Sequence, residues 1–337
     1  MDVVHAKAAV FDHAGGADVI ELRSVAVPAP QDGEVRVRIN AIGLNRSEAM
    51  FREGWHPVQP DFPSRLGYEA AGVVESVGAG VTRFAAGDRV STLPIMELNA
   101  RGAYGEMFTV PAALVVESPP ELSDEETAAL WSSYMTAYGM VVELVKIEAG
   151  DWILVTAASS SLGPPIMQIL AQLGARVIAT TRGREKAEAI RAMGAEHVVV
   201  TGDEDLAERV MAITGGRGVR FVFDPVAGPL VETLAQVTQP YGAIVLYGVL
   251  DFAAAPLPIM PVIGKNLSII GYAMMLEDQP ERNERAIAFI REGVRAGTLK
   301  PLLGKRFPLD EIRNAARYFD SMQQIGKIIV VPDRPAN

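Results

Sequence analysis

The sequence places a run of small residues, Thr156–Gly163, between an apolar strand pattern, Trp152–Val155, and a helical pattern that begins at Pro164. Serine and alanine side chains take little room, so the backbone of this run can approach a ligand closely. The free N–H groups of a helix's first turn, together with the helix dipole, favour an anion such as a phosphate. Of the dinucleotide fingerprint G-x-G-x-x-G, only the last glycine is present. We therefore expect the pyrophosphate of a dinucleotide to bind to Ser159, Ser160, Ser161, Leu162 and Gly163.

Basic residues follow the next strand pattern, Arg176–Thr180. Dinucleotide-binding folds that select NAD place an acidic residue at this strand end, where it binds the ribose 2′-hydroxyl. This sequence has Thr181 there, followed by Arg182, Arg184 and Lys186. Cationic side chains neutralise a 2′-phosphate, and arginine can bind it through two parallel hydrogen bonds. We therefore expect NADPH, bound by Thr181, Arg182 and Lys186, with a solvated start of a basic helix as the alternative.

Other chemistries lack the residues that they need. The sequence has no cysteine, so it has no disulfide, thiolate nucleophile or cysteine-based metal site. Its four histidines show no metal-ligand spacing, and the G-x-S-x-G, Walker and H-E-x-x-H motifs are absent. A net charge of −10 argues against a nucleic-acid partner, because phosphate backbones bind basic surfaces.

The 337 residues predict two domains of different architecture. The first third contains short alternating segments, such as Val35–Ile39, separated by turns rich in glycine and proline, which is typical of a compact β domain. Near Ser123–Glu126 a capping box predicts the start of helix, which then runs to about Val145. Beyond it, apolar strands alternate with amphipathic helices. This alternation predicts an α/β fold with a doubly wound parallel sheet covered on both faces.

No part of the sequence predicts entry into a membrane. The N-terminus lacks the pattern of a signal peptide, and no run approaches the roughly 18 apolar residues of a membrane span. We therefore expect a soluble, cytoplasmic protein. Leu267–Tyr272 is predicted to be an apolar edge strand, and pairing it with the same strand of a second copy would cover that edge.

Seven short motifs occur in an order that spans nearly the whole chain. They are Gly43–Glu48, Gly67–Gly72, Ala86–Val90, Thr136–Tyr138, Ala157–Gly163, Val222–Val226 and Gly326–Ile329. By these motifs the chain resembles the medium-chain dehydrogenase/reductase superfamily, and within it the zinc-free quinone oxidoreductase branch. The resemblance implies a GroES-like β-barrel domain of residues 1–126, completed by residues 276–337. It also implies a Rossmann domain of residues 127–275, a cofactor between the domains and usually a homodimer.

The resemblance also gives the positions at which zinc-dependent members of the superfamily hold their metal. Asn45, Tyr68 and Ser132 replace the cysteine, histidine and cysteine expected there. Zinc prefers thiolate, imidazole or carboxylate ligands, so we expect no metal site. Glu69, beside Tyr68, is expected to be structural.

Without a metal to polarise it, the hydride acceptor must itself stabilise negative charge. The resemblance therefore implies an NADPH-dependent reductase of quinones or α,β-unsaturated carbonyls. Asn45 and Tyr68 are the catalytic candidates. The Asn45 amide is expected to donate to a substrate oxygen or to orient the nicotinamide side, and the Tyr68 phenol to act as a hydrogen-bond or proton donor or as a packed ring. Trp55 and His56 are expected in a loop beside the substrate.

Further cofactor contacts are expected at Thr136, Asp224, Gly248 and Val249. Two alternatives stay open. One is an enoyl-thioester or alkenal reductase with a narrow substrate, and the other is a non-catalytic dinucleotide-sensing protein.

Overall fold

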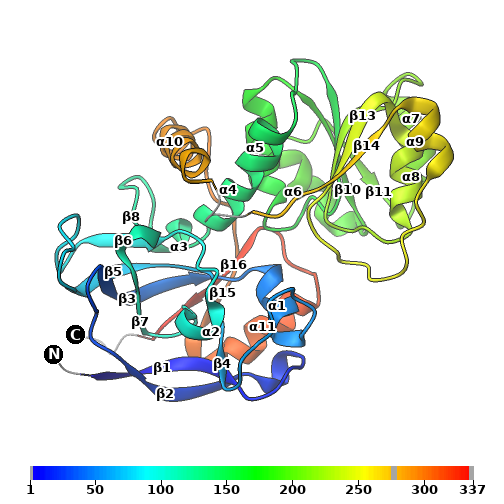
Figure 1. Ribbon diagram of the computed structural model, residues 1–337. Helices are drawn as coiled ribbons and strands as arrows, with labels where there is room; N and C mark the ends of the chain where they lie inside the picture. Colours follow the sequence, from blue (N-terminus) through cyan, green and yellow to red (C-terminus); the bar gives the residue numbers. More distant parts are fainter. Residues whose placement is uncertain (1–2, 275–278, 334–337) are drawn as a thin grey trace. The chain divides into compact units, whose positions relative to one another are not determined.

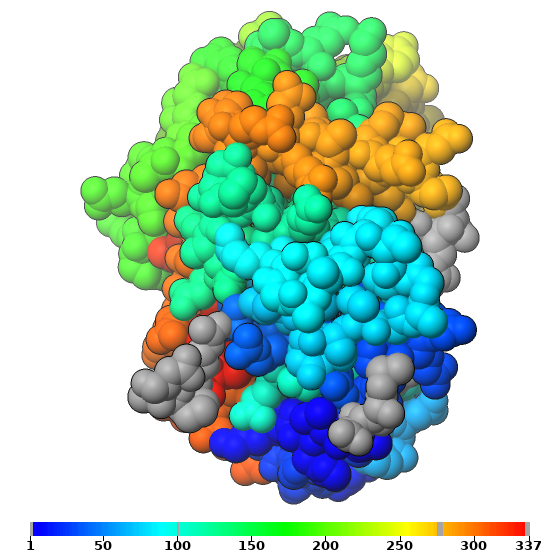
Figure 2. Space-filling view, turned by 90° about the vertical axis from the view of Figure 1, so that its left-hand side faces the viewer, coloured from blue at the N-terminus to red at the C-terminus, as the bar shows by residue number. Residues whose placement is uncertain are grey.

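The computed structural model describes residues 3–274 and 279–333, and the chain divides into two compact units (Figure 1). Unit 1 comprises Met1–Ser133 and Lys300–Asn337, and unit 2 comprises Tyr134–Leu299. The first boundary lies seven residues beyond the predicted one. The second differs more, because helix α10 (Pro280–Arg295) belongs to unit 2 and not to the C-terminal completion of the first domain. Figure 2 shows this helix, in orange, at the surface.

Unit 1 is built mainly from β-strands. They are β1 (Val4–Phe11), β2 (Glu21–Val27), β3 (Glu34–Gly43), β4 (Ser64–Arg65), β5 (Glu69–Val77), β6 (Arg89–Thr92), β7 (Met107–Pro111), β8 (Val115–Glu117), β15 (Leu303–Pro308) and β16 (Lys327–Val331). A three-stranded sheet has the order β2-β1-β4, and a seven-stranded sheet has the order β15-β16-β3-β5-β6-β8, with β7 also paired to β3. Val35, Val37 and Ile39 of β3 are buried in the core of the unit, as their alternation predicts. The C-terminal strand β16 pairs directly with β3, so the end of the chain completes this sheet.

Short helices accompany these sheets: α1 (Arg46–Glu53), α2 (Leu98–Arg101), α3 (Asp124–Thr127) and α11 (Ile312–Asp320). The predicted capping box begins α3, since the N–H of Glu126 donates to the Ser123 hydroxyl and the N–H of Ser123 donates to the Glu126 carboxylate. The predicted continuous helix is interrupted after Thr127, whose hydroxyl donates to the carbonyl of Ser123 in competition with the backbone. Helix resumes as α4 (Trp131–Tyr138) and widens into a π-helical segment over Gly139–Leu144.

Unit 2 is a six-stranded sheet in which every pair of neighbours is parallel. Its strands are β9 (Trp152–Val155), β10 (Arg176–Thr181), β11 (His197–Val200), β12 (Val219–Asp224), β13 (Thr238–Leu246) and β14 (Ser268–Gly271). Its helices besides α4 and α10 are α5 (Gly163–Gln172), α6 (Ala187–Ala192), α7 (Leu206–Ile213), α8 (Leu230–Val237) and α9 (Ile259–Lys265). Figure 1 shows α7, α8 and α9 along one side of the sheet and α5 and α6 along the other. The structure thus confirms the predicted parallel sheet with helices on both faces.

Candidate functional site

The two central strands of unit 2 end side by side where the strand order reverses. The order β11-β10-β9-β12-β13-β14 is that of dinucleotide-binding sheets, which bind ligands beyond the carboxyl ends of the strands at this point. Thr156 follows β9, and its hydroxyl donates a hydrogen bond to the carboxylate of Asp224, the last residue of β12. The other carboxylate oxygen accepts the N–H of Ala227 at 2.7 Å. Asp224 is fully buried, which raises the pKa of its carboxyl. It joins the two strand ends, and both of its oxygens are occupied by the chain itself.

The turn after β9 offers unpaired hydrogen-bond donors. Within the described part of the chain, the N–H groups of Ser159, Ser161 and Leu162 have no acceptor. The hydroxyl of Ser160 is buried and also lacks a partner. Buried polar groups in folded proteins nearly always have partners, so these donors are open to water or to a ligand. Phosphate oxygens are acceptors only, and they fit this set of donors.

Gly163 lets helix α5 begin directly against this turn. A Cβ atom on Gly163 would lie 1.8 Å from the carbonyl oxygen of Ala158. The first turn of α5 contributes fewer donors than an ordinary helix, because Pro164 and Pro165 have no N–H. An anion at this position would therefore depend on the N–H groups of the turn, chiefly those of Ser161 and Leu162.

The residues after β10 include a cation without a protein partner. Thr181 is buried, and its hydroxyl donates to the carbonyl of Gly183 at 3.3 Å. Arg184 is paired with Asp203 at 2.5 Å, and burial lowers the pKa of Lys186. Arg182 is exposed, and its guanidinium makes no hydrogen bond or ion pair among the described residues. Arg182 is therefore available to an anionic ligand, whereas Arg184 is already neutralised.

The remaining predicted cofactor residues lie on two other elements of unit 2. Thr136, on α4, is half-buried, and its hydroxyl donates to the sulfur of Met274 at 3.7 Å. Gly248 and Val249 follow β13, in the segment that begins with Tyr247. Sequence reasoning missed the Tyr247 hydroxyl, which is buried without a partner and whose pKa is raised by burial. Its place directly after β13, at the carboxyl edge of the sheet, was the one signal that pointed to it.

A buried ion pair lies inside unit 1. Lys327, on β16, and Glu69, on β5, are 2% and 1% exposed, and the ammonium group is 2.5 Å from Glu69 Oε1. The ammonium also donates to Asn45 Oδ1 at 2.7 Å. Asn45 Nδ2 lies 3.2 Å from the carbonyl of Gly43 and 3.3 Å from Glu69 Oε1. Both ends of the Asn45 amide are therefore engaged within the chain.

Glu48, in the first turn of α1, connects this cluster to Tyr68. Its carboxylate accepts the N–H of Asn45 at 2.7 Å, the N–H of Tyr68 at 2.5 Å and the hydroxyl of Tyr104 at 2.5 Å. Asn45 and Glu48 together form the capping box that begins α1. Burial raises the pKa of Glu48 to about 7, although these hydrogen bonds act in the opposite direction.

The Tyr68 side chain is buried beside the loop that follows α1. Its hydroxyl oxygen is 3.3 Å from His56 Nε2, and it also takes part in a hydrogen bond with Ser47. Burial raises the pKa of Tyr68 to about 12. His56 is half-buried, and Trp55 next to it is 65% exposed. The structure therefore brings together Tyr68 and the loop expected beside the substrate, and it places Asn45 in the buried cluster.

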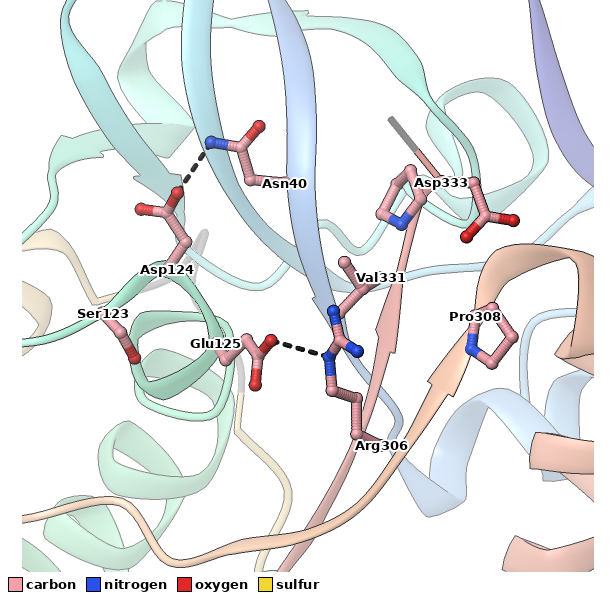
Figure 3. A pocket seen from close by; sticks show the side chains of 9 residues that line it. Asn40, Ser123, Asp124, Glu125, Arg306, Pro308, Val331 and Asp333 are labelled. Carbon is pink, nitrogen blue, oxygen red and sulfur yellow. Dashed lines mark hydrogen bonds and ion pairs between the residues drawn. The ribbon is translucent and has the colours of Figure 1, made fainter. Parts of the chain in front are cut away.

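A separate cavity of about 510 Å³ lies in unit 1 (Figure 3). Its walls include Asn40, Asp124, Glu125 and Arg306, none of which is a predicted site residue. Asn40 donates to Asp124 at 2.7 Å, and Arg306 pairs with Glu125 at 2.8 Å, as the dashed lines in Figure 3 show. Two of the three carboxylates in this wall, those of Asp124 and Glu125, thus have protein partners, and we assign no ligand to the cavity.

Comparison with known proteins identifies the family. Residues 31–120 match the model of the alcohol dehydrogenase GroES-like domain, and residues 162–292 match that of the zinc-binding dehydrogenase. A 2-haloacrylate reductase of Burkholderia sp. is 34% identical over 332 residues, which cover 96% of this chain and 98% of that protein. The chain belongs to the medium-chain dehydrogenase/reductase superfamily. Its relatives place it in the quinone oxidoreductase-like branch, as the motifs predict.

Two solved structures share the whole architecture of this medium-chain dehydrogenase/reductase. A crystal structure of an NAD-dependent alcohol dehydrogenase superposes with a TM-score of 0.90 at 31% identity, covering 96% of this chain and 99% of the other. The quinone oxidoreductase of Escherichia coli, solved in complex with NADPH, superposes with a TM-score of 0.88 at 28% identity, covering 97% and 100%. These likenesses confirm the predicted Rossmann sheet and GroES-like domain.

The superfamily includes zinc enzymes, so the fit of a zinc ion to this member can be tested from its residues. Asn45 and Tyr68 stand where the resemblance places two zinc ligands, and neither an amide nor a protonated phenol is a usual zinc ligand. At the third, Ser132, the backbone N–H donates to Glu69 Oε2 at 2.9 Å. The cluster also already contains a cation, the ammonium of Lys327. These residues do not fit zinc, and the described part of the chain contains no group of three histidine, aspartate or glutamate side chains suited to a metal.

Across residues 3–274 and 279–333, no helix combines the length and the apolar character needed to cross a lipid bilayer.

Proposed function

We propose that this medium-chain dehydrogenase/reductase is an NADPH-dependent oxidoreductase that reduces quinones or α,β-unsaturated carbonyl compounds without zinc. The observation that carries the proposal is the turn after β9, whose buried Ser160 hydroxyl and free N–H groups lack acceptors. The NADPH complex of the Escherichia coli quinone oxidoreductase supports this cofactor. The unpaired Arg182, together with Thr181 in place of an acidic residue, supports a 2′-phosphate over a free 2′-hydroxyl.

In this proposal unit 2 binds the coenzyme through its own donors. The N–H groups of Ser161 and Leu162 and the Ser160 hydroxyl hold the pyrophosphate, and Arg182 holds the 2′-phosphate through charge-assisted hydrogen bonds. Thr136 and Gly248–Val249 are proposed to contact the nicotinamide half. Asp224 holds the ends of β9 and β12 in place through Thr156. Bound NADPH supplies a hydride.

In unit 1, Tyr68 is proposed to donate a hydrogen bond or a proton to the acceptor. Asn45 is proposed to position this residue rather than to touch the substrate, because Lys327 and Glu69 occupy its amide. Asn45 and Tyr68 are linked through Glu48, which accepts the N–H of both. These hydrogen bonds fix the backbone of Tyr68 and so position its phenol.

The acceptor class follows from the chemistry of a site without a Lewis acid. Hydride addition needs an acceptor that spreads the incoming negative charge onto an oxygen, as quinones and activated alkenes do. The name of the Burkholderia 2-haloacrylate reductase supports the activated alkene. The enoyl-thioester or alkenal reductase and the dinucleotide-sensing protein remain the competing proposals.

A panel of acceptors tests the proposal. We expect purified protein to oxidise NADPH with a benzoquinone, a cyclic enone or 2-chloroacrylate as acceptor, with kcat/KM for NADPH at least tenfold above that for NADH. Elemental analysis should find no stoichiometric zinc, and chelators should not alter turnover. Zinc-dependent turnover, or failure to bind either nucleotide, would refute the proposal.

We further propose a homodimer formed through the edge of the unit 2 sheet. Strand β14 pairs only with β13 among the described strands, and large apolar side chains are exposed on α9 beside it. Ile259, Met260 and Ile263 are 56%, 79% and 69% exposed. Exposed edges and apolar patches of this kind typically become covered by a partner. Light scattering should give a molar mass twice that of one chain. The double variant Met260→Glu/Ile263→Glu should lower this mass toward that of a single chain, and an unchanged mass would refute this interface.

A cytoplasmic location stays a prediction.

A further inference from the structure

His56 gives Tyr68 a connection to solvent. The hydroxyl oxygen of Tyr68 and Nε2 of His56 are 3.3 Å apart. Tyr68 is buried, whereas His56 is half-buried and its neighbours Trp55 and Pro57 are exposed. A proton that leaves the phenol can therefore be replaced from water through one imidazole ring.

The backbone of Val58 can hold the His56 ring in either protonation state. His56 Nδ1 lies 3.1 Å from the nitrogen and 3.3 Å from the carbonyl oxygen of Val58. When Nδ1 carries no proton, it accepts the Val58 N–H, and the proton of the neutral ring is on Nε2, facing Tyr68. When Nδ1 is protonated, it donates to the Val58 carbonyl. The ring can thus gain a proton at Nδ1 and lose one at Nε2 without leaving its place.

The groups around the Tyr68 hydroxyl favour both the loss of its proton and its rapid reprotonation. His56 Nε2 and the Ser47 hydroxyl both approach the Tyr68 oxygen, and hydrogen bonds to a phenolate stabilise it. The charged neighbour is Glu48, whose carboxylate disfavours a lasting phenolate and so favours reprotonation. The Phe51 ring packs edge-on against His56, with 6.0 Å between the ring centroids.

We infer that Tyr68 and His56 form a proton relay for the reduction of activated carbon–carbon double bonds, an inference that rests on the proposed function. In that reaction a hydride bonds to the β-carbon, the π electrons move to the carbonyl oxygen, and the enolate formed must gain a proton at its α-carbon. The Tyr68 O–H supplies that proton. As the Nε2–H of the neutral His56 ring passes to the phenolate, Nδ1 takes a proton from water, so the ring stays neutral and becomes the Nδ1–H tautomer. Proton exchange with water then returns the ring to the Nε2–H tautomer before the next turnover. Quinone reduction leaves its negative charge on an oxygen, which water protonates readily, so it depends less on the relay.

The ratio of two activities tests the inference on the full-length protein. We expect His56→Ala and Tyr68→Phe each to lower kcat for cyclohex-2-enone at least tenfold more than kcat for 1,4-benzoquinone, since positioned acid–base groups contribute about 10²–10⁴-fold. Added imidazole should restore enone reduction by His56→Ala but not by Tyr68→Phe. His13→Ala, an exposed histidine in the same unit, is the matched control and should behave as wild type.

Structural damage is separated from loss of the relay by a second variant and a second readout. His56→Gln keeps a side chain of similar reach, and NADPH binding by fluorescence and Tm should match wild type in both His56 variants. An unchanged activity ratio, or no imidazole rescue in a variant that folds and binds NADPH, would overturn the relay. Wild-type protein that reduces the quinone but not the enone would also overturn it, leaving the proposed function intact. Failure of wild type with both acceptors would overturn the proposed function itself.

Discussion

Replacing Lys327 with methionine is expected to destabilise unit 1 strongly. Methionine keeps most of the apolar stem but removes the ammonium group 2.5 Å from Glu69. The Glu69 carboxylate would stay buried, with hydrogen bonds only from the N–H of Ser132 at 2.9 Å and the Asn45 amide at 3.3 Å. Removing one partner of a buried ion pair costs about 3–5 kcal/mol. In a unit of roughly 170 residues, where each kcal/mol shifts Tm by about 2–4 °C, this corresponds to a loss of about 6–20 °C.

Calorimetry of three variants checks this reasoning. Lys327→Met should show the full loss, whereas the double variant K327M/E69Q should recover more than half of it, because no uncompensated charge then remains. Lys7→Met is the matched control, since Lys7 forms a solvent-exposed pair with Asp310 at 2.9 Å and pairs of this kind contribute little to stability. A loss below about 1 kcal/mol in K327M, or a double variant no more stable than the single one, would refute the buried-charge reasoning.

Three further predictions concern the coenzyme turn and the buried carboxyl. Arg182→Ala should lower kcat/KM for NADPH by roughly ten- to a hundredfold and kcat/KM for NADH far less. Arg184→Ala should have a smaller effect, because Arg184 is already paired with Asp203. Equal losses for both nucleotides in Arg182→Ala would contradict this. Gly163→Ala should cost about 1–3 kcal/mol in urea unfolding and weaken NADPH binding, while Gly264→Ala, where a Cβ meets nothing within 4 Å, should do neither. Glu48 has a folded pKa of about 7 against an ordinary 4.5, so the folded state holds this proton more firmly than the unfolded chain. Its contribution to the free energy of unfolding is full below pH 4.5 and falls by about 3 kcal/mol as the pH rises to 7. Urea unfolding at pH 5 and pH 8 should show this fall in wild type and not in Glu48→Gln.

The architecture of unit 2 was predictable because its signals are local. Each strand is a short apolar run and each helix has its own periodicity, so the alternation of Trp152–Val155 with α5 and Arg176–Thr181 can be seen without knowing what packs against what. The position of the turn between β9 and α5 follows in the same way, and its role in binding a dinucleotide stays a prediction. The sequence also shows two prolines after Gly163. Their effect, fewer N–H donors in the first turn of α5, could be recognised only once the structure showed that the helix begins at Gly163.

The cluster in unit 1 was not predictable from local pattern. Glu69 and Lys327 are 258 positions apart, and nothing in the segment around Lys327 indicates that its ammonium is buried. For the same reason Asn45 was expected to face a substrate, because its engagement by Lys327 depends on the pairing of β16 with β3. The closeness of His56 and Tyr68 likewise depends on how the loop after α1 folds back over β5.

The pairing of β16 with β3 also bears on how the chain matures during synthesis. All strands of unit 2 leave the ribosome before residue 300, so that sheet can close early. The first 133 residues must wait, with the carboxylate of Glu69 lacking its cation, until Lys327 is made. A chain whose synthesis stops shortly before Lys327 would therefore contain the complete sheet of unit 2 and an incomplete unit 1. Truncations that remove β16 would therefore deserve the same care as substitutions in the site.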